Sequence, residues 1–183
     1  MGTPARLRRT YFDCRFGQLH VHQAIPPGGG FDEATALVCL PGARGLGSFF
    51  SVLLGPLGNN RSIYAPDLPG FGGSDPVPGA ADAGQWACAV ADLLDSLRQR
   101  RVDVLAQGEG LEVAMALVAL RPELVRRIGW SAASPAALAR ARQCGVPLRE
   151  FSLAAAGATA VAEGALGSQL DDLMGFFGED PAA

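Results

Sequence analysis

A glycine-rich turn between an apolar run and a helix-like stretch constrains the fold more than any other part of this sequence. Residues 102–105 read Val-Asp-Val-Leu, residues 106–110 read Ala-Gln-Gly-Glu-Gly, and residues 111–120 are mostly apolar and helix-forming. This order predicts a buried strand, a tight turn and a helix. We therefore expect a strand–turn–helix unit with Gly108 at the centre of the turn.

The same alternation of strand and helix extends over residues 35–131. Strands are expected at 35–40, 62–65, 102–106 and 127–130, and helices after Ser48, which could cap the first of them, at 85–97 and at 111–120. A hairpin of residues 10–16 and 18–23, joined through Gly17, opens the sheet. The predicted fold class is α/β, with a doubly wound, mostly parallel sheet and helices on both faces.

The last fifty residues differ from this core in being alanine-rich and helix-prone. We divide the chain into a core of residues 1–133 and a helical C-terminal tail or lid of residues 134–183 that packs on it. Helices are expected at 135–143, 151–164 and 168–178, the last with an apolar face of Leu170, Leu173, Met174 and Phe177. The strand at 127–130 would expose an unpaired edge, so the tail, a second copy or a complementing chain is expected to cover it.

Composition excludes several classes of function. The net charge is −3 with no extended basic stretch, which predicts no nucleic-acid binding, and no apolar run is long enough to span a membrane. The four cysteines, Cys14, Cys39, Cys88 and Cys144, are widely spaced and show no C-x-x-C pattern, so we expect no metal site. We also expect no cofactor and a cytoplasmic location. Cys39 is expected to be a small buried hydrophobe.

Four stretches carry a resemblance to a known family: Phe-Gly-Gln-Leu-His-Val at 16–21, Tyr-Ala-Pro-Asp-Leu-Pro-Gly-Phe-Gly-Gly-Ser-Asp at 64–75, the turn at 106–110, and Arg-Pro-Glu-Leu-Val-Arg-Arg at 121–127. With these motifs in this order, the sequence resembles the α/β-hydrolase superfamily, in particular its small-substrate esterases, C–C bond hydrolases, epoxide hydrolases and haloalkane dehalogenases. The resemblance covers roughly residues 8–132 and implies that Asp67 and Asp75 brace the loop they begin and end.

Three departures from the family pattern concern chemistry. The family turn holds a nucleophilic serine or aspartate where this chain has Gly108, and a His-Gly pair where it has Pro41-Gly42. The family's acid and histidine lie on later strands, beyond residue 183, so we expect a truncated core. His20 and His22, the two histidines present, are expected to lie on one face of an edge strand, remote from the site.

The remaining candidates surround the turn. Backbone N–H groups of Ala43 or Arg44 and of Glu109 are expected to form an oxyanion-hole-like concavity, and Glu109 is a weak candidate nucleophile beside the vacant position. Ser131 and Ser134 could line the pocket, but without a histidine base a serine is a poor nucleophile. The predicted pocket residues are Gly42, Ala43, Arg44, Gln107, Gly108, Glu109 and Trp130.

Three functional hypotheses follow. The first is a degenerate α/β-hydrolase that binds a small, partly apolar molecule or a protein partner without turnover. The second is a hydrolase of an ester or related small substrate, completed by a second chain or using an atypical nucleophile. The third is a gene product with no selected activity. Residue 108 separates the first from an ordinary serine hydrolase, but the sequence does not choose among the three.

Overall fold

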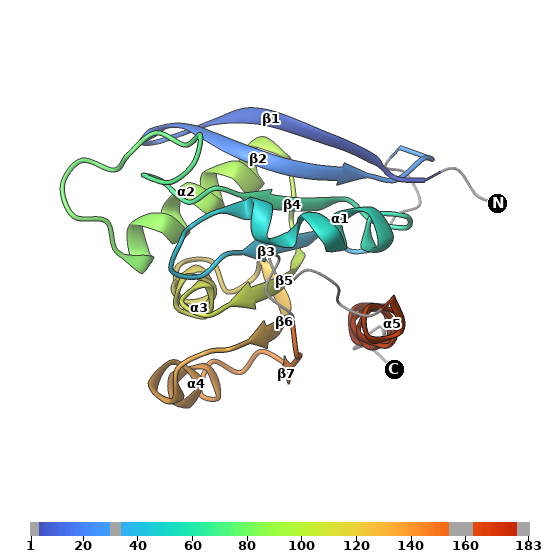
Figure 1. Cartoon of the computed structure of the whole chain (residues 1–183). Helices are drawn as coiled ribbons and strands as arrows, with labels where there is room; N and C mark the ends of the chain where they lie inside the picture. The colour runs from blue at the N-terminus through green and yellow to red at the C-terminus, as the bar shows by residue number, and fades with distance from the viewer. Residues whose placement is uncertain (1–3, 30–33, 154–162, 179–183) are drawn as a thin grey trace.

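The computed structural model describes residues 4–29, 34–153 and 163–178, and within them the strands form one sheet in the order β1-β2-β4-β3-β5-β6-β7 (Figure 1). β1 pairs with β2, and β2 with β4, in antiparallel fashion, while all other neighbours are parallel. The strands are β1 Arg6–Cys14, β2 Gly17–Ile25, β3 Leu37–Leu40, β4 Ile63–Pro66, β5 Val102–Gln107, β6 Val125–Ser131 and β7 Leu148–Glu150. The mostly parallel sheet predicted from the sequence is confirmed.

Helices cover both faces of this sheet (Figure 1). They are η1 Gly47–Phe50, a short 3-10 helix, and α1 Ser51–Leu57, α2 Ala83–Ser96, α3 Gly110–Leu120, α4 Pro135–Ala141 and α5 Glu163–Gly178. Buried side chains of α2, α3 and α4 share one apolar cluster, and those of η1, α1 and α5 share another. The doubly wound arrangement is therefore also confirmed.

The central strands explain why two clusters form. Successive residues of a strand point to opposite faces, and in β3 Val38 joins the cluster of α2 and α3, while Leu37 and Cys39 join that of α1 and α5. A strand buried on both faces must be apolar at every position, which is typical of parallel sheets. Cys39 is 1% exposed, and its burial raises the pKa of its thiol, as expected of an inert core residue.

Local signals set the helix ends. Asp82 accepts a hydrogen bond from the backbone N–H of Gln85 at 2.8 Å, and the Gln85 side chain accepts one from the Asp82 N–H, so a capping box begins α2 two residues before the predicted start. The expectation that Ser48 caps the helix after the glycine-rich turn is wrong. Ser48 lies inside η1, and the residue before α1 is Phe50, whose side chain makes no capping hydrogen bond. The glycine-rich turn tightens into 3-10 geometry before α1 begins.

The part of the tail that the structure describes covers the outer edge of β6. β7, which the sequence analysis did not predict, pairs in parallel with Ile128, Gly129 and Trp130. Phe151 continues the connection by donating its N–H to the Trp130 carbonyl at 2.7 Å. Of the helix expected at 151–164, residues 151–153 are not helical and residues 154–162 lie outside the described residues.

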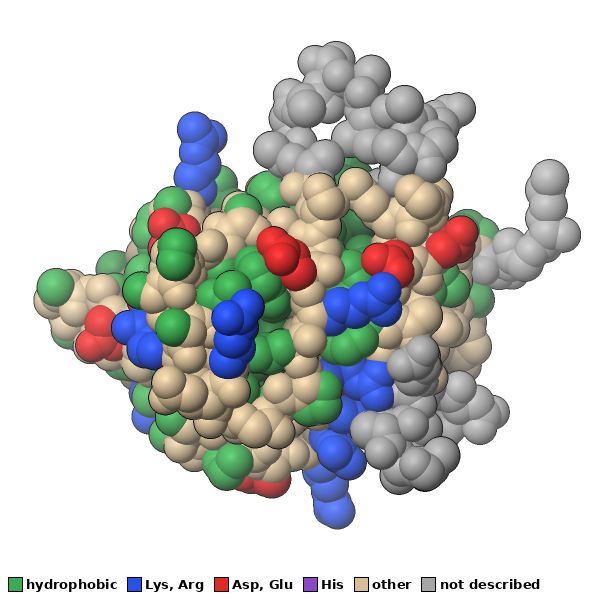
Figure 2. Space-filling view, turned by 90° about the horizontal axis from the view of Figure 1, so that it is seen from below, with side chains coloured by type: hydrophobic (Ala, Val, Ile, Leu, Met, Phe, Trp, Pro, Cys, Tyr) green, Lys and Arg blue, Asp and Glu red, His purple; other side chains and the backbone are tan. Residues whose placement is uncertain are grey.

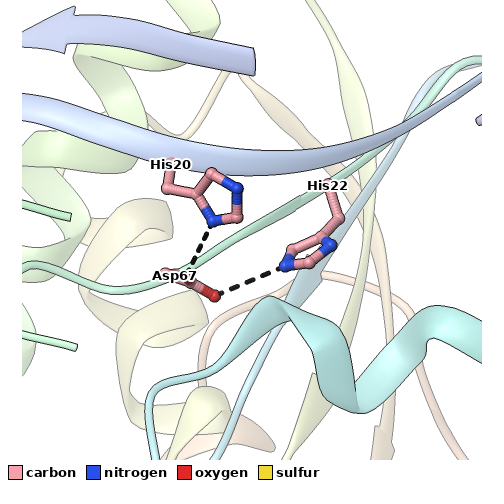
Figure 3. Close-up of side chains that lie close together, drawn as sticks. All are labelled: His20, His22 and Asp67. Carbon is pink, nitrogen blue, oxygen red and sulfur yellow. Dashed lines mark hydrogen bonds and ion pairs between the residues drawn. The ribbon is translucent and has the colours of Figure 1, made fainter. Parts of the chain in front are cut away.

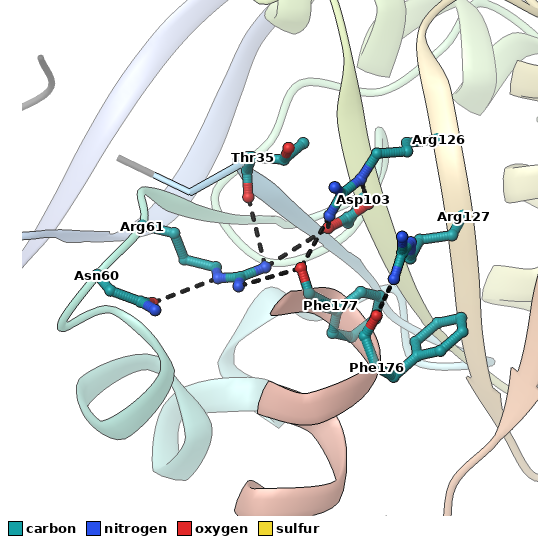
Figure 4. A network of polar contacts seen from close by, with 8 residues as sticks. All are labelled: Thr35, Asn60, Arg61, Asp103, Arg126, Arg127, Phe176 and Phe177. Carbon is teal, nitrogen blue, oxygen red and sulfur yellow. Dashed lines mark hydrogen bonds and ion pairs between the residues drawn. The ribbon is translucent and has the colours of Figure 1, made fainter. Parts of the chain in front are cut away.

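The end of α5 is held by arginines around one buried carboxylate (Figure 4). Arg126 binds Asp103 through two hydrogen bonds of 2.8 and 2.6 Å, and Arg61 approaches it at 3.4 Å. Arg61 and Arg126 also donate to the Phe177 carbonyl, at 3.3 and 2.8 Å, and Arg127 donates to that of Phe176. Because a helix C-terminus is negative, cations there stabilise it. Burial raises the pKa of Asp103 and lowers that of Arg61.

The apolar face of α5 differs from the predicted one. Leu173 and Phe177 are buried, but Met174 is 42% exposed and Phe176 is buried in its place. Phe176 and Phe177 both contact Phe151, at ring-centroid distances of 5.6 and 6.1 Å. The helix is rotated relative to the predicted stripe because this aromatic cluster fills the space over Gly129, where a side chain would collide with two of the rings.

The surface carries mixed charge. In the view from below, acidic and basic side chains lie close to one another in the upper part of the face, with hydrophobic side chains exposed between them (Figure 2). Between β7 and α5, Arg149 and Asp172 form an ion pair at 2.5 Å. Among the helices described, none is long and apolar enough to cross a lipid bilayer.

Candidate functional site

The turn between β5 and α3 has the backbone geometry of an elbow. Gly108 has a φ of +54°, in the left-handed region, and its N–H donates to the Ser131 carbonyl at the end of β6 at 2.8 Å. A Cβ atom placed on Gly108 would approach the Gly42 Cα to 3.6 Å and the Ala132 oxygen to 4.0 Å, which are ordinary contacts. The space for a side chain remains at this position although the sequence supplies none.

A pocket of about 650 Å³ opens beside the elbow. Its lining includes six of the seven residues that the sequence analysis named: Gly42, Ala43, Arg44, Gln107, Gly108 and Glu109. The turn after β3, the elbow and the segment after β6 meet here because parallel strands β3, β5 and β6 end at the same edge of the sheet. Leu46 and Ser134 also line the pocket, as do Ala132 and Ala133, which the sequence analysis did not single out.

The side chains before and after Gly108 converge on the turn that follows β3. A Cβ atom on Gly42 would lie 2.2 Å from Gln107 Oε1 and 3.1 Å from Glu109 Oε2. Gly42 is therefore required where it stands, because any side chain would occupy the space of the Gln107 amide. The Glu109 side chain lines the pocket next to Gly42 and is exposed to solvent.

Trp130 is the predicted pocket residue that does not line the pocket. It is 7% exposed and belongs to the core cluster of α2, α3 and α4, because β6 directs its side chain to that face of the sheet. Ser131 is buried, and its Oγ accepts a hydrogen bond from the Leu153 N–H at 3.2 Å. Ser134 Oγ accepts from the Ala137 N–H at 3.1 Å and so caps α4 at the pocket rim.

The two histidines lie elsewhere than predicted. They share one face of β2, as expected, but β2 is not an edge strand, because β1 lies outside it. His20 Nδ1 is 2.8 Å from Asp67 Oδ2, and His22 Nε2 is 3.8 Å from Asp67 Oδ1 (Figure 3). Asp67 directly follows β4, so the histidines are not remote from the carboxyl ends of the parallel strands. Burial lowers the pKa of His22.

The acidic residues of the following loop brace it. Asp67 accepts hydrogen bonds from the backbone N–H groups of Gly47 at 2.8 Å and Gly73 at 3.1 Å, and Asp75 accepts one from the Gln18 N–H at 2.8 Å. The bracing role expected for both residues is confirmed. Leu46 and Ser48, on either side of Gly47, line the pocket. Because Asp67 binds the Gly47 N–H, it also helps to position this part of the pocket wall.

Curated relatives resemble part of this chain. It is 35% identical over 89 residues to a 2-hydroxymuconate semialdehyde hydrolase of Pseudomonas putida, an alignment that covers 48% of this chain and 30% of that protein. A second 2-hydroxymuconate semialdehyde hydrolase, of Pseudomonas sp. strain CF600, is 33% identical over 73 residues, or 39% of this chain and 26% of that protein. The matched part of the chain thus spans only 26–30% of the length of these curated relatives.

Solved structures show the same fold. The epoxide hydrolase CorEH superposes with a TM-score of 0.63 and 21% identity over 71% of this chain and 44% of that structure. The naproxen esterase of Bacillus subtilis superposes with a TM-score of 0.62 and 24% identity, with the same coverage of both chains. Residues 37–183 match the family described as the alpha/beta hydrolase family. With its sheet order, elbow and pocket in place, this chain belongs to the alpha/beta hydrolase family.

Proposed function

We propose that this chain binds a small molecule in the pocket beside Gly108 and does not hydrolyse it through a covalent intermediate. The observation that carries the proposal is the pairing of an intact elbow backbone, with φ of +54° at Gly108, with the absence of a side chain at that position. Acyl transfer through an elbow requires an oxygen nucleophile activated by a base. Gly108 has no such oxygen, while the pocket around it persists.

The other hydroxyl groups at the pocket do not replace the missing one. Ser134 Oγ is engaged in capping α4, and no histidine is among the described residues that line the pocket. A serine hydroxyl without a hydrogen-bonded base is a weak nucleophile at neutral pH. These contacts support binding over turnover by a relocated serine.

The lining indicates a ligand with an apolar body and one oxygen-bearing end. Leu46, Phe49 and Ala137 supply apolar surface, and within the described ranges no hydrogen bond engages the side chains of Arg44 or Gln107. Polar groups that lack partners in a concave apolar site are the ones that orient a ligand. The compound in the name of the curated relatives, 2-hydroxymuconate semialdehyde, has a carboxylate end that suits Arg44 and an aldehyde at its other end, and it is the first probe we would use.

The test is a calorimetric titration of the chain with 2-hydroxymuconate semialdehyde, followed by chromatography of the recovered compound. Ser48→Trp places an indole at the pocket mouth, and Ser51→Trp, exposed at the start of α1 outside the pocket, is the matched control. We expect binding in the parent and in Ser51→Trp, at least tenfold weaker binding in Ser48→Trp, and unchanged compound afterwards. Equal affinity in both variants, or recovery of cleaved products, would contradict the proposal.

Glu109 supports a second candidate function. Its Oε2 atom lies 3.1 Å from the position of a Cβ on Gly42, and Glu109 lines the same pocket as Gly108, so the pocket contains a carboxylate. A carboxylate can act as a nucleophile by displacing the leaving group from an acyl carbon to form a mixed anhydride, or from an alkyl carbon to form an ester, which water then hydrolyses. If the chain is a hydrolase, Glu109→Gln abolishes its turnover of short-chain p-nitrophenyl esters. Completion of the site by a second polypeptide stays a prediction.

A further inference from the structure

Two imidazoles and one carboxylate converge outside the pocket, between β2 and the end of β4 (Figure 3). One ligand atom from each of His20, His22 and Asp67 lies within 4.8 Å of the other two. The two rings face the same carboxylate from one strand, with centroids 4.8 Å apart. Each histidine nitrogen that approaches Asp67 does so at a different carboxylate oxygen.

The backbone fixes this arrangement. His20 and His22 are separated by two positions and therefore share a face of β2. β2 pairs with β4 so that Val21 lies opposite Pro66, and the Asp67 N–H donates to the His20 carbonyl at 2.9 Å. Two of the side chains thus project from β2, and the third from the residue that follows β4 and is hydrogen-bonded to β2, which fixes their relative positions as a preformed ligand set requires.

The carboxylate is oriented by donors outside the cluster. Gly47 N–H binds Asp67 Oδ1 and Gly73 N–H binds Asp67 Oδ2. A Cβ atom on residue 72 would lie 2.1 Å from Asp67 Oδ2, so the backbone can pass this close to the carboxylate only because residue 72 is glycine. Hydrogen bonds of this kind hold metal-ligating carboxylates in place and leave further lone pairs of the oxygens available.

We propose that His20, His22 and Asp67 bind one divalent transition metal ion of the zinc class, with a solvent molecule as the fourth ligand. Imidazole and carboxylate suit Zn²⁺, whose bonds of about 2.0–2.2 Å put tetrahedral ligand atoms roughly 3.4 Å apart. The present separations of 2.8 Å and 3.8 Å are to different carboxylate oxygens, and one ligand atom from each residue lies within 4.8 Å of the other two. Side-chain rotations that close the widest of these gaps by up to about 1.4 Å would admit the ion. Binding through His20 Nδ1 requires the tautomer of the neutral ring that carries its proton on Nε2, so the ion takes the place of the Nδ1–Asp67 contact.

The three side chains are accessible enough for a metal ion to enter and enclosed enough to retain it. His20 and His22 are 15% and 13% exposed and Asp67 is 5% exposed, so solvent reaches the rings while the carboxylate is nearly enclosed. The site is separate from the pocket lining, but Asp67 holds Gly47, whose neighbours line the pocket. The proposal is independent of the proposed function, and the absence of ligand binding leaves it intact.

The test uses tag-free protein titrated with Zn²⁺ by calorimetry and with Co²⁺ by visible absorption. His20→Gln and His22→Gln remove one ligand each, and circular dichroism checks their folding. Glu109→Gln and Cys14→Ser, which remove other metal-binding groups, are the controls. We expect one Zn²⁺ per chain, a tetrahedral Co²⁺ spectrum without thiolate bands, and affinity reduced more than about 100-fold in each histidine variant, beyond the roughly 10–100-fold typical of outer-shell changes.

Three outcomes would overturn the proposal. The first is the absence of Zn²⁺ binding in the folded parent. The second is unchanged affinity in both histidine variants, which would place any bound metal elsewhere. The third is a Co²⁺ spectrum with thiolate bands that Cys14→Ser removes, which would assign binding to cysteine.

Discussion

Replacing Gly108 with alanine tests whether the elbow conformation is retained at a position without a nucleophile. Because φ at residue 108 is +54°, a residue with a Cβ atom there lowers the free energy of unfolding by about 1–2 kcal/mol, the cost of the left-handed conformation. The nearest atom to that Cβ is 3.6 Å away, so no collision adds to the penalty. Alanine also lowers the conformational entropy of the unfolded chain, which offsets about 0.4–1 kcal/mol. A net destabilisation of about 0.8 kcal/mol remains.

Gly175→Ala is the matched control for this prediction. Gly175 lies in the interior of α5 with no atom within 4 Å of a Cβ and no positive φ, so alanine should raise the free energy of unfolding by about 0.5–1 kcal/mol. Urea unfolding of the parent and both variants measures the two effects, and with a slope of about 2 kcal/mol per molar the Gly108→Ala midpoint falls by roughly 0.4 M. An increase in both midpoints would refute the left-handed elbow.

Three further outcomes are expected. Phe177→Ala lowers the free energy of unfolding by about 3–5 kcal/mol because its ring is 2% exposed, whereas Met174→Ala, 42% exposed, changes it by under about 0.5 kcal/mol; thermal unfolding distinguishes them. Gly42→Ala weakens ligand binding in the pocket, since its Cβ would lie 2.2 Å from a neighbouring amide oxygen; calorimetry measures the loss. Hydrogen bonds from Arg15 lower the pKa of Asp92 from 3.8, so this pair stabilises the fold above that pH and loses its effect as pH falls below it; Asp92→Asn flattens the acid limb of a stability–pH curve.

The core of the fold was predictable because its signals are local. Apolar runs marked β3 and β5, helical spacing marked α2, and the glycines of the elbow marked the turn between β5 and α3. β7 was missed because three residues, two of them charged, carry no strand pattern of their own; the unpaired edge of β6 determines their conformation. Ser48 was misassigned because a capping residue also fits inside a 3-10 turn.

The site was predictable where it depends on sequence order and missed where it depends on strand pairing. The turn after β3 and the elbow meet because their strands are parallel neighbours, so six pocket residues could be named. Trp130 was misplaced because the face of β6 that it occupies depends on register. The contact of His20 with Asp67 joins residues 47 positions apart, through the pairing of β2 with β4, which no local pattern encodes.

The most direct test of the central claim is the release of p-nitrophenol from short-chain p-nitrophenyl esters, followed alongside the intact mass of the protein. The parent is compared with Glu109→Gln, which removes the carboxylate beside Gly108, and with Gly108→Ser, which restores a hydroxyl. The account predicts that the parent forms no acyl adduct and releases p-nitrophenol no faster than Glu109→Gln. Turnover or acylation of the parent that Glu109→Gln abolishes would contradict it and make this chain a hydrolase with a displaced nucleophile.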